Sequence, residues 1–279
     1  MDEWLTTMLN SLGSTGGYAV NDLLKLPADY SPDLYHATIL IHDTAVKPIT
    51  AIVLAIMFVL MLATVSTQSE GDRELGVRIV AASMFKIAMV FIVAQNAPMF
   101  LDALASIAHT IATTANGIDV GAGGGTTAKL GDTLKGDIAD LGMVEKSTLL
   151  VLLILPWLVS NLAAVLAIVL VYVRFVQMYI MSAFASLPLA FIGHPETKSI
   201  GIGYLKSYAS VALTGTIIVI TVKFYQALTG GFGGLLDGYD GNFTTFIFGS
   251  FGKFFVPPLV LIFLLLSANG LAKKILGEA

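Results

Sequence analysis

The stretch that decides the fold covers residues 149–184 and reads LLVLLILPWLVSNLAAVLAIVLVYVRFVQMYIMSAF. Its one charged residue is Arg174. A helix needs about 20 predominantly apolar residues to cross a bilayer, and this stretch is longer than one crossing requires. Strands of a membrane barrel would instead be about 10 residues long and would alternate apolar with polar side chains. The stretch therefore predicts transmembrane α-helix.

The composition of the whole chain agrees with a membrane protein. Of its 279 residues, 56% are hydrophobic and 12% are charged, whereas soluble domains carry about 25% charged residues. The net charge of −4 argues against a basic surface for nucleic acid. The absence of cysteine excludes disulfide bonds, thiolate metal ligands and cysteine nucleophiles. We predict an all-α, polytopic integral membrane protein whose first partner is the lipid bilayer.

Six apolar runs are long enough, or nearly long enough, to cross a bilayer. Each is free of charged residues or is interrupted by a single lysine. They cover residues 48–69, 79–101, 147–173, 175–193, 207–222 (extended past Lys223 to about 228) and 254–272.

The third and fourth runs are separated by Arg174 alone, so they form either a hairpin of two helices or one long helix. The sequence around Arg174, VYVRFVQMY, contains no Gly, Pro, Asn or Asp, the residues that turns favour. One long helix that breaks near Pro188 gives five spans, and a hairpin gives six. With five spans, the basic residues near helix ends place the N-terminus outside and the C-terminus in the cytoplasm. We predict five spans, with six as the alternative.

The apolar runs divide the chain into four regions. Residues 1–47 are a polar and amphipathic N-terminal region, and 48–111 form a first transmembrane helix pair. Residues 112–146 are rich in Gly and Thr and are predicted to be an extracytoplasmic loop. Residues 147–279 are predicted to hold the C-terminal transmembrane helices, with a cytoplasmic elbow near 188–206.

A short amphipathic helix is predicted at the N-terminus. Its apolar residues recur at helical spacing. They are Trp4, Leu5, Met8, Leu9 and Leu12. This helix either packs on the protein's own surface or lies in the membrane interface, and the sequence leaves both interpretations open.

No motif in the sequence supports an enzyme. Ser83-Met-Phe-Lys86 matches the Ser-x-x-Lys pattern of acyl enzymes, but the companion motifs are absent and the pair lies in a predicted span. Glycine-rich stretches at 121–129 and 201–207 lack the spacing of a phosphate-binding loop. The four histidines have no metal-ligand spacing. We therefore predict no catalytic residues, no cofactor and no metal site.

Charged residues inside the apolar runs are the next candidates for function. Lys86, Arg174 and Lys223 must reach the interface, form pairs or face a polar cavity. A solute transporter or ion channel would use them as a transport site. The predicted spans hold no acidic residue, although coupled transporters commonly need a carboxylate there, and this counts against secondary transport.

The segment ASLPLAFIGHPETKSIGIGYLKSYASVALTGTIIVI (185–220) carries a polar knuckle between two apolar helices. The helix that precedes it begins near Arg174 as VRFVQMYIMSAFASLPLAF, and the knuckle includes Pro195-Glu196-Thr197. Together with IGIGYLKSYASVALTGTIIVI, this pattern resembles the TrbL-like, VirB-type polytopic inner-membrane subunits of conjugative type IV secretion systems, particularly those of Gram-positive mobile elements. The similarity is concentrated in residues 170–222, and the rest of the chain agrees in layout.

The resemblance implies a role in an assembly and not a reaction. Members look like ring-forming platforms in the bacterial cytoplasmic membrane that support translocation of DNA or protein. The implied partners are further copies of the chain, a secretion ATPase, a coupling protein, bitopic channel subunits and the translocating DNA. The residues expected to contact partners are Arg174, Pro188, Glu196, Lys198 and Lys206. The alternative remains a multispan solute or ion transporter or channel, which would work without these partners.

Overall fold

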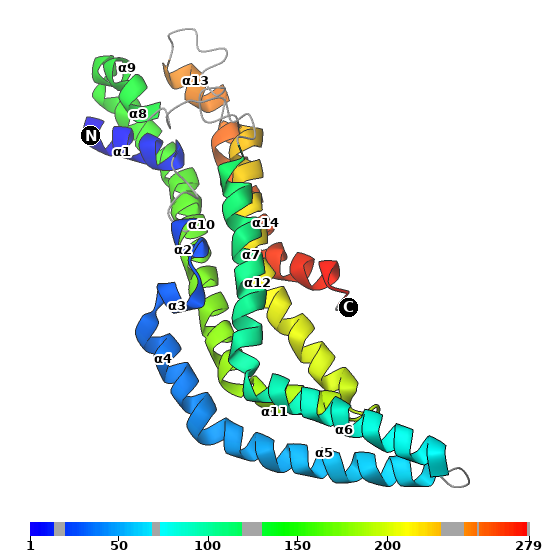
Figure 1. Cartoon of the computed structure of the whole chain (residues 1–279). Coiled ribbons are helices and arrows are strands. Elements are labelled where there is room, and N and C mark those ends of the chain that lie inside the picture. Colours follow the sequence, from blue (N-terminus) through cyan, green and yellow to red (C-terminus); the bar gives the residue numbers. More distant parts are fainter. Residues whose placement is uncertain (14–19, 69–72, 119–129, 230–242, 250, 278–279) are drawn as a thin grey trace. The chain divides into compact units, whose positions relative to one another are not determined.

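The computed structural model describes residues 1–13, 20–68, 73–118, 130–229, 243–249 and 251–277, which form helices joined by short turns (Figure 1). These residues include no strand, so the prediction of an all-α chain is confirmed. Five helical stretches in this described part are long and apolar enough to cross a membrane. They are Pro32–Thr64, Val77–Gln95, Met143–Phe184, Lys198–Tyr225 and Phe251–Ile275.

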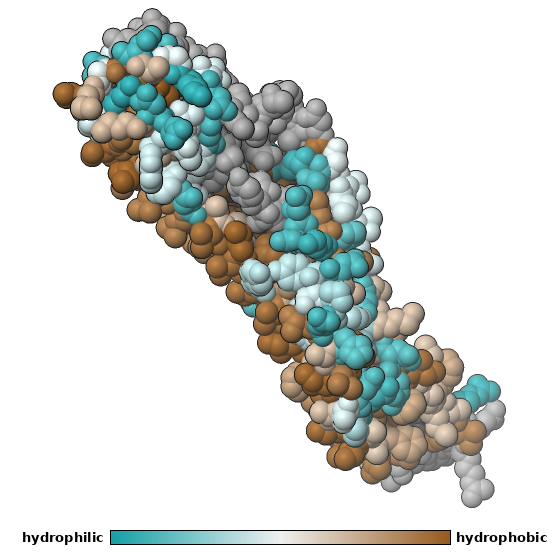
Figure 2. Space-filling view, turned by 90° about the vertical axis from the view of Figure 1, so that its left-hand side faces the viewer, coloured by the Kyte–Doolittle hydropathy of each residue, from teal (hydrophilic) through white to brown (hydrophobic). Residues whose placement is uncertain are grey.

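Large apolar side chains remain exposed along the candidate spans, and Figure 2 shows hydrophobic residues over much of the visible surface. Phe85, Val151 and Phe263, for example, expose 69%, 74% and 70% of their surface. Water-soluble monomers rarely expose contiguous apolar surface on this scale. The candidate spans therefore carry the surface that lipid hydrocarbon requires.

Helix α10 (Met143–Phe184) is one continuous helix of 42 residues. It passes through Arg174 without a turn, as the missing turn residues predict. A single turn at Ala185 separates it from α11 (Ser186–Ala190), which contains Pro188. Proline lacks an N–H and its ring clashes with the carbonyl four residues earlier, so a helix cannot continue unchanged through that position. The predicted break near Pro188 is thereby confirmed.

The structure divides into two compact units, and α10 and α12 (Lys198–Thr229) contribute to both. The first unit comprises residues 1–24, 111–173 and 215–269. Its helices include α1 (Asp2–Gly13), α2 (Val20–Leu23), α8 (Leu130–Thr133), α9 (Lys135–Asp140), α13 (Phe243–Gly249) and most of α14 (Phe251–Ile275). Its buried core consists of Leu5, Met8, Leu9, Leu12, Leu134, Ile138, Leu149, Leu153, Phe246, Ile247 and Phe254.

The N-terminal helix packs on the protein itself. Four of its apolar residues, Leu5, Met8, Leu9 and Leu12, are buried in the core of the first unit, so the own-surface interpretation is confirmed for that face of α1. Trp4 differs, because it remains 65% exposed.

Polar contacts hold α1 against α8. The side-chain oxygen of Asn10 accepts hydrogen bonds from the backbone N–H groups of Gly131 and Asp132, at 2.9 and 3.3 Å. The Asn10 amide also donates to the carboxylate of Asp132 at 3.2 Å. These bonds satisfy N–H groups at the start of α8, which lack partners within so short a helix.

The second unit comprises residues 25–110, 174–214 and 270–279. It begins with α3 (Pro27–Tyr30), α4 (Pro32–Ile41), a π-helical turn η1 (His42–Val46) and α5 (Lys47–Gln68). It continues with α6 (Arg73–Gln95) and most of α7 (Ala97–Gly117), and later with α11 and the 3-10 turn η2 (Phe191–Gly193). One buried cluster of this unit consists of Ala97, Leu101, Ala105, Ala108, Met178, Ala185, Leu189, Tyr208 and Ala212.

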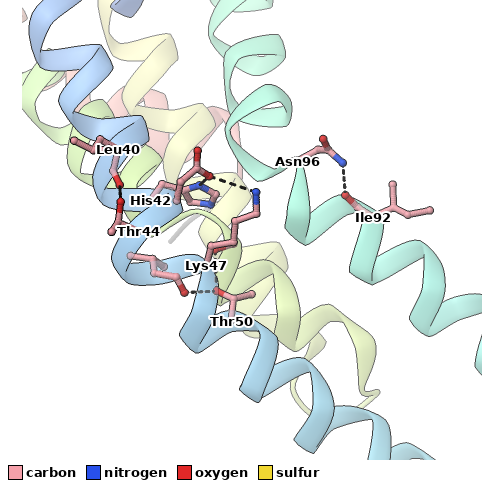
Figure 3. Close-up of polar contacts among 10 residues, drawn as sticks. Leu40, His42, Thr44, Lys47, Thr50, Ile92 and Asn96 are labelled. Atoms are coloured by element: carbon pink, nitrogen blue, oxygen red, sulfur yellow. Dashed lines mark hydrogen bonds and ion pairs between the residues drawn. The ribbon is translucent and has the colours of Figure 1, made fainter.

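Two candidate spans, Pro32–Thr64 and Val77–Gln95, fall in the region of the predicted transmembrane helix pair at 48–111. The predicted end of the second span at 101 is corrected by the structure, in which a further helix, α7, begins before that point. Helix α6 ends at Gln95, and α7 starts at Ala97 with Pro98 in its first turn. The side-chain amide of Asn96 donates to the carbonyl of Ile92 at 2.9 Å (Figure 3). The same carbonyl also accepts the backbone N–H of Asn96 at 3.2 Å, and Pro98 cannot supply a helical N–H to the turn before it.

The predicted loop at 112–146 is also largely helical where it is described. Helix α7 continues to Gly117, α8 and α9 follow, and α10 begins at Met143. Leu134 and Ile138 are buried in the core with α1. Packing against this distant segment stabilises short helices that the local sequence does not predict. The glycine-rich residues 119–129 lie outside the described part.

The close approach of α1 and α8 generates a test. A methyl group added at Gly131 would run into the backbone of Thr6, whereas one added at Gly136 would meet open space. We expect Gly131→Ala to destabilise the packing of α1 by about 1–3 kcal/mol, and Gly136→Ala to be neutral or slightly stabilising. Limited proteolysis of the detergent-solubilised chain, followed at the α1 cleavage sites, measures the difference. Equal resistance in the two variants would contradict the close contact.

Candidate functional site at the elbow after α10

Arg174 lies in α10 and is almost fully buried, with 5% of its surface exposed. Its Nη2 donates a hydrogen bond to the backbone carbonyl of Ala212 in α12 at 3.2 Å. The guanidinium carbon lies 5.0 Å from the ring centre of Phe175. Nε and Nη1 are buried and have no hydrogen-bond partner in the described part of the chain. Arg174 therefore ties α10 to α12 while two of its nitrogens remain unsatisfied.

The buried guanidinium is costly for the fold. Arginine remains protonated in proteins, and a buried charge that lacks a full set of partners costs several kcal/mol. Ionisable residues within membrane segments that persist at such cost are candidates for function. The geometry therefore makes Arg174 a candidate functional group and not a simple interfacial anchor.

An aromatic layer surrounds this part of α10. The ring of Tyr30 stacks on Phe175 with a centroid separation of 3.9 Å and an interplanar angle of 7°. The hydroxyl of Tyr179 donates to the backbone carbonyl of Pro27 at 2.7 Å. These contacts fix α3 against α10 within the second unit.

Helix α7 adds a carboxylate to the same unit. Tyr35 of α4 donates a hydrogen bond to Asp102 of α7 at 2.5 Å. Burial raises the pKa of Asp102 above its usual value, and the hydrogen bond from Tyr35 opposes that rise. Tyr208 of α12 is buried in the cluster that α7 shares with α10 and α12. Two polar contacts, Tyr35 with Asp102 and Arg174 with the carbonyl of Ala212, thus join α4 to α7 and α10 to α12 within this unit.

The elbow, defined here as residues 185–198, packs against the hairpin of α5 and α6. The hydroxyls of Ser186 and Thr50 are hydrogen-bonded at 2.8 Å, and both residues are buried. Ala190 belongs to a buried cluster with Leu54, Val90 and Ala94. The helix that follows the elbow passes close by, because a side chain at Gly201 would collide with Ile192 and the carbonyl of Pro188.

The polar turn at the end of the elbow is held by its own side chains. Thr197 donates its hydroxyl to the carbonyl of Phe191 at 2.8 Å. The backbone N–H of Glu196 donates to Nδ1 of His194 at 3.3 Å, and Nε2 of His194 lies 3.5 Å from the hydroxyl of Thr64 in α5. The side chains of Glu196 and Lys198 remain exposed. A rigidly held turn thus presents an acidic and a basic residue to the outside of the unit.

The predicted contact residues separate into two groups. Arg174 is buried and Pro188 is partly buried, whereas Glu196, Lys198 and Lys206 are exposed. The first two residues shape the elbow, and the last three are free to meet another molecule. Of the remaining intramembrane charges, Lys86 lies on α6 in the second unit and Lys223 on the part of α12 in the first unit, and both are partly exposed.

Sequence reasoning missed two polar features of the second unit. Asp102 was not identified as a candidate because the predicted span ended one residue before it. Tyr35 was not identified because residues 1–47 were predicted to be a polar region. His42 is buried in η1, where its Nδ1 lies 3.1 Å from a carboxylate oxygen of Asp43, which also accepts from Lys47 at 3.4 Å (Figure 3). The sequence signal that could have identified the His42 contacts is the group of His42, Asp43 and Lys47 at the start of an apolar run.

The unsatisfied guanidinium predicts an unusual response to mutation. We expect Arg174→Met to leave the free energy of unfolding unchanged or to raise it by about 1–4 kcal/mol. The reason is that an apolar side chain of similar length removes the cost of burying the charge. Arg174→Lys keeps the charge without the planar fork, and we expect it to lower stability. Thermal unfolding of the purified chain in detergent measures both. A large loss of stability in Arg174→Met would show that the guanidinium is fully paired.

The chain matches a known protein family over more than half of its length. The family model described as "TrbL/VirB6 plasmid conjugal transfer like protein" matches residues 14–186, which is more than half of the chain. The match includes Arg174 and ends at the start of α11, so the pattern noted over 187–222 lies beyond it. No curated protein and no solved structure matches the chain. On the strength of the family match, the chain belongs to the TrbL/VirB6-like family of plasmid conjugal transfer proteins.

Proposed function

We propose that this chain is a membrane platform subunit of a conjugative type IV secretion machine, and that its elbow is the element that contacts partner subunits. The family membership makes the chain a component of conjugal transfer machinery. The observation that carries the finer proposal is the elbow itself, because it combines buried packing against α5 and α6 with exposed charges at its tip. A preorganised turn of this kind loses little conformational freedom when it binds.

The proposed mechanism is assembly and not catalysis. Further copies of the chain would form a ring, and a secretion ATPase, a coupling protein and bitopic subunits would dock on it. The energy for translocation of DNA or protein would come from the ATPase. Glu196, Lys198 and Lys206 would give the docking surface its charge pattern, which sets the encounter rate and the choice of partner.

Small residues of α12 are used within the chain. Ser210 and Ala212 are buried, and Ala212 belongs to the cluster that includes Ala97, Ala105 and Ala108 of α7. Small side chains let helices approach closely in membranes, and here they do so within one subunit. A ring of copies would therefore form through other surfaces than this face of α12.

The first test is conjugative transfer of the mobile element that encodes the chain. An in-frame deletion of the gene should abolish transfer, and the wild-type gene supplied in trans should restore it. We expect Glu196→Lys to restore transfer at least tenfold less well, which corresponds to ~1.4 kcal/mol of lost contact energy.

Lys135→Glu is the matched control, because it reverses an exposed charge on α9 in the first unit. It should support transfer as well as the wild type does, with equal amounts of both variants in the membrane. Full transfer by Glu196→Lys would remove the elbow from the docking surface. Unchanged transfer in the deletion strain, together with altered uptake or efflux of a solute, would favour the transporter alternative.

The orientation of the elbow has its own test. In the proposed arrangement, the C-terminus and the elbow face the cytoplasm, and the N-terminus and α9 face the outside. The chain contains no cysteine, so Glu196→Cys and Lys135→Cys each introduce a unique thiol. An impermeant maleimide added to intact cells should label the cysteine at position 135, and should label that at position 196 after permeabilisation alone. Labelling at position 196 in intact cells would contradict a cytoplasmic elbow.

A further inference from the structure

The N-terminal part of the first unit exposes apolar side chains that its core does not use. The cap is defined here as α1, α8, α9 and the first turn of α10. Met1 and Trp4 on α1 are 56% and 65% exposed, and Met143 and Val144 on α10 are 77% and 80% exposed. At the upper end of Figure 2, where the cap lies, hydrophobic residues stand among hydrophilic ones. Exposed apolar side chains rimmed by polar residues mark an interaction surface.

An ion pair places these side chains at the same end of the cap. Nζ of Lys146, in the first turn of α10, lies 2.9 Å from a carboxylate oxygen of Asp2 in the first turn of α1. The hydrogen bond from Lys146 lowers the pKa of the Asp2 carboxyl. Trp4 and Met143 therefore lie in the two helical turns that the ion pair of Asp2 and Lys146 connects.

The depth of α1 follows from its packing on α10. The buried face of α1 shares a core with Leu149 and Leu153, which lie in the candidate span Met143–Phe184. Leu149 is three residues beyond Lys146, the last charged residue before the apolar part of that helix, which corresponds to a rise of ~4.5 Å. The polar interface of a bilayer is about 5–8 Å thick on each side of the hydrocarbon core. A helix that packs against the first turns of a span therefore lies at the level of the interface.

The chemistry of α1 indicates which part of the lipid it meets. The helix has Asp2 and Glu3 in its first turn and contains no Lys or Arg. Helices that bind anionic headgroups are rich in basic residues on their polar face. This helix has no basic side chain that could bind such a headgroup. Tryptophan, in contrast, is enriched at the boundary between headgroups and acyl chains because its ring is apolar and its N–H is a donor.

From these observations we infer that the cap is a lipid-facing surface in which Trp4 sits at the boundary between headgroups and hydrocarbon. The apolar face of α1 holds the cap to the protein, and Trp4, on the flank of that face, holds it to the membrane. The contact depends on apolar and aromatic surface and is independent of headgroup charge. The inference does not depend on the proposed role in secretion.

The chain is suited to a direct test because it contains two tryptophans, Trp4 and Trp157. Trp157→Phe leaves Trp4 as the single fluorophore of the full chain, and Trp4→Phe leaves Trp157, in the candidate span, as the matched control. Each variant is reconstituted into phosphatidylcholine vesicles that contain lipids brominated at a shallow or a deep acyl position. Iodide is added from the aqueous side as a second quencher.

We expect Trp4 to be quenched more strongly by the shallow bromines and Trp157 more strongly by the deep ones. Replacing a third of the phosphatidylcholine with phosphatidylglycerol should leave the quenching of Trp4 unchanged. Strong iodide quenching of Trp4 with no effect of brominated lipid would show that the cap stands in water and would overturn the inference. Deep quenching of Trp4 equal to that of Trp157 would overturn it too, because α1 would then be inserted. A strong dependence on phosphatidylglycerol would refute the independence from headgroup charge.

Discussion

The backbone of a membrane-spanning segment must satisfy its hydrogen bonds without water, and this constraint explains most of the fold. It keeps α10 helical for 42 residues, through Pro156 and Arg174, because any turn would leave carbonyl and N–H groups without partners. It also explains the many hydroxyls that bond within their own helix. Thr38, Thr50 and Thr214, for example, each donate to the carbonyl four residues earlier. At the break between α6 and α7, the side-chain amide and the backbone N–H of Asn96 both donate to the carbonyl of Ile92.

Arg174 places a buried charge in the second unit. Within the described residues its guanidinium has one protein acceptor and two nitrogens without a partner, and buried side-chain atoms of His42, Tyr208 and Ser210 also lack a partner. Asp102, a carboxylate of the same unit, is held by Tyr35 instead. A buried charge without a full set of partners lowers stability.

The sequence predicted the elements that depend on local chemistry and missed those that depend on packing. The continuity of α10 followed from the absence of turn residues around Arg174, and the break followed from Pro188. The start of α7 was missed because Asn96 and Pro98 interrupt an apolar run without ending it, and the hydrogen bond from Asn96 to Ile92 is visible only in three dimensions. Helices α8 and α9 could not be predicted either, because their burial depends on α1, more than 100 residues away along the chain. The sequence was enough to predict the polar turn that holds Glu196. It did not indicate that Arg174 is buried while Glu196 is exposed.

The position of the elbow links these features to function. A break in an apolar helix usually weakens it, yet α11 is buried between α5 and α6 by Leu54, Val90 and Ala94, and Ser186 bonds to Thr50. The break is therefore part of the packed body of the second unit. The start of α12 packs closely against the elbow, because a Cβ at Gly201 would collide with Ile192 and the carbonyl of Pro188. The same helix carries Ala212, the acceptor of Arg174, three turns further on. The exposed turn at Glu196 and the unsatisfied guanidinium are therefore joined by one helix, α12, which is the path along which the docking proposed above would reach the bundle.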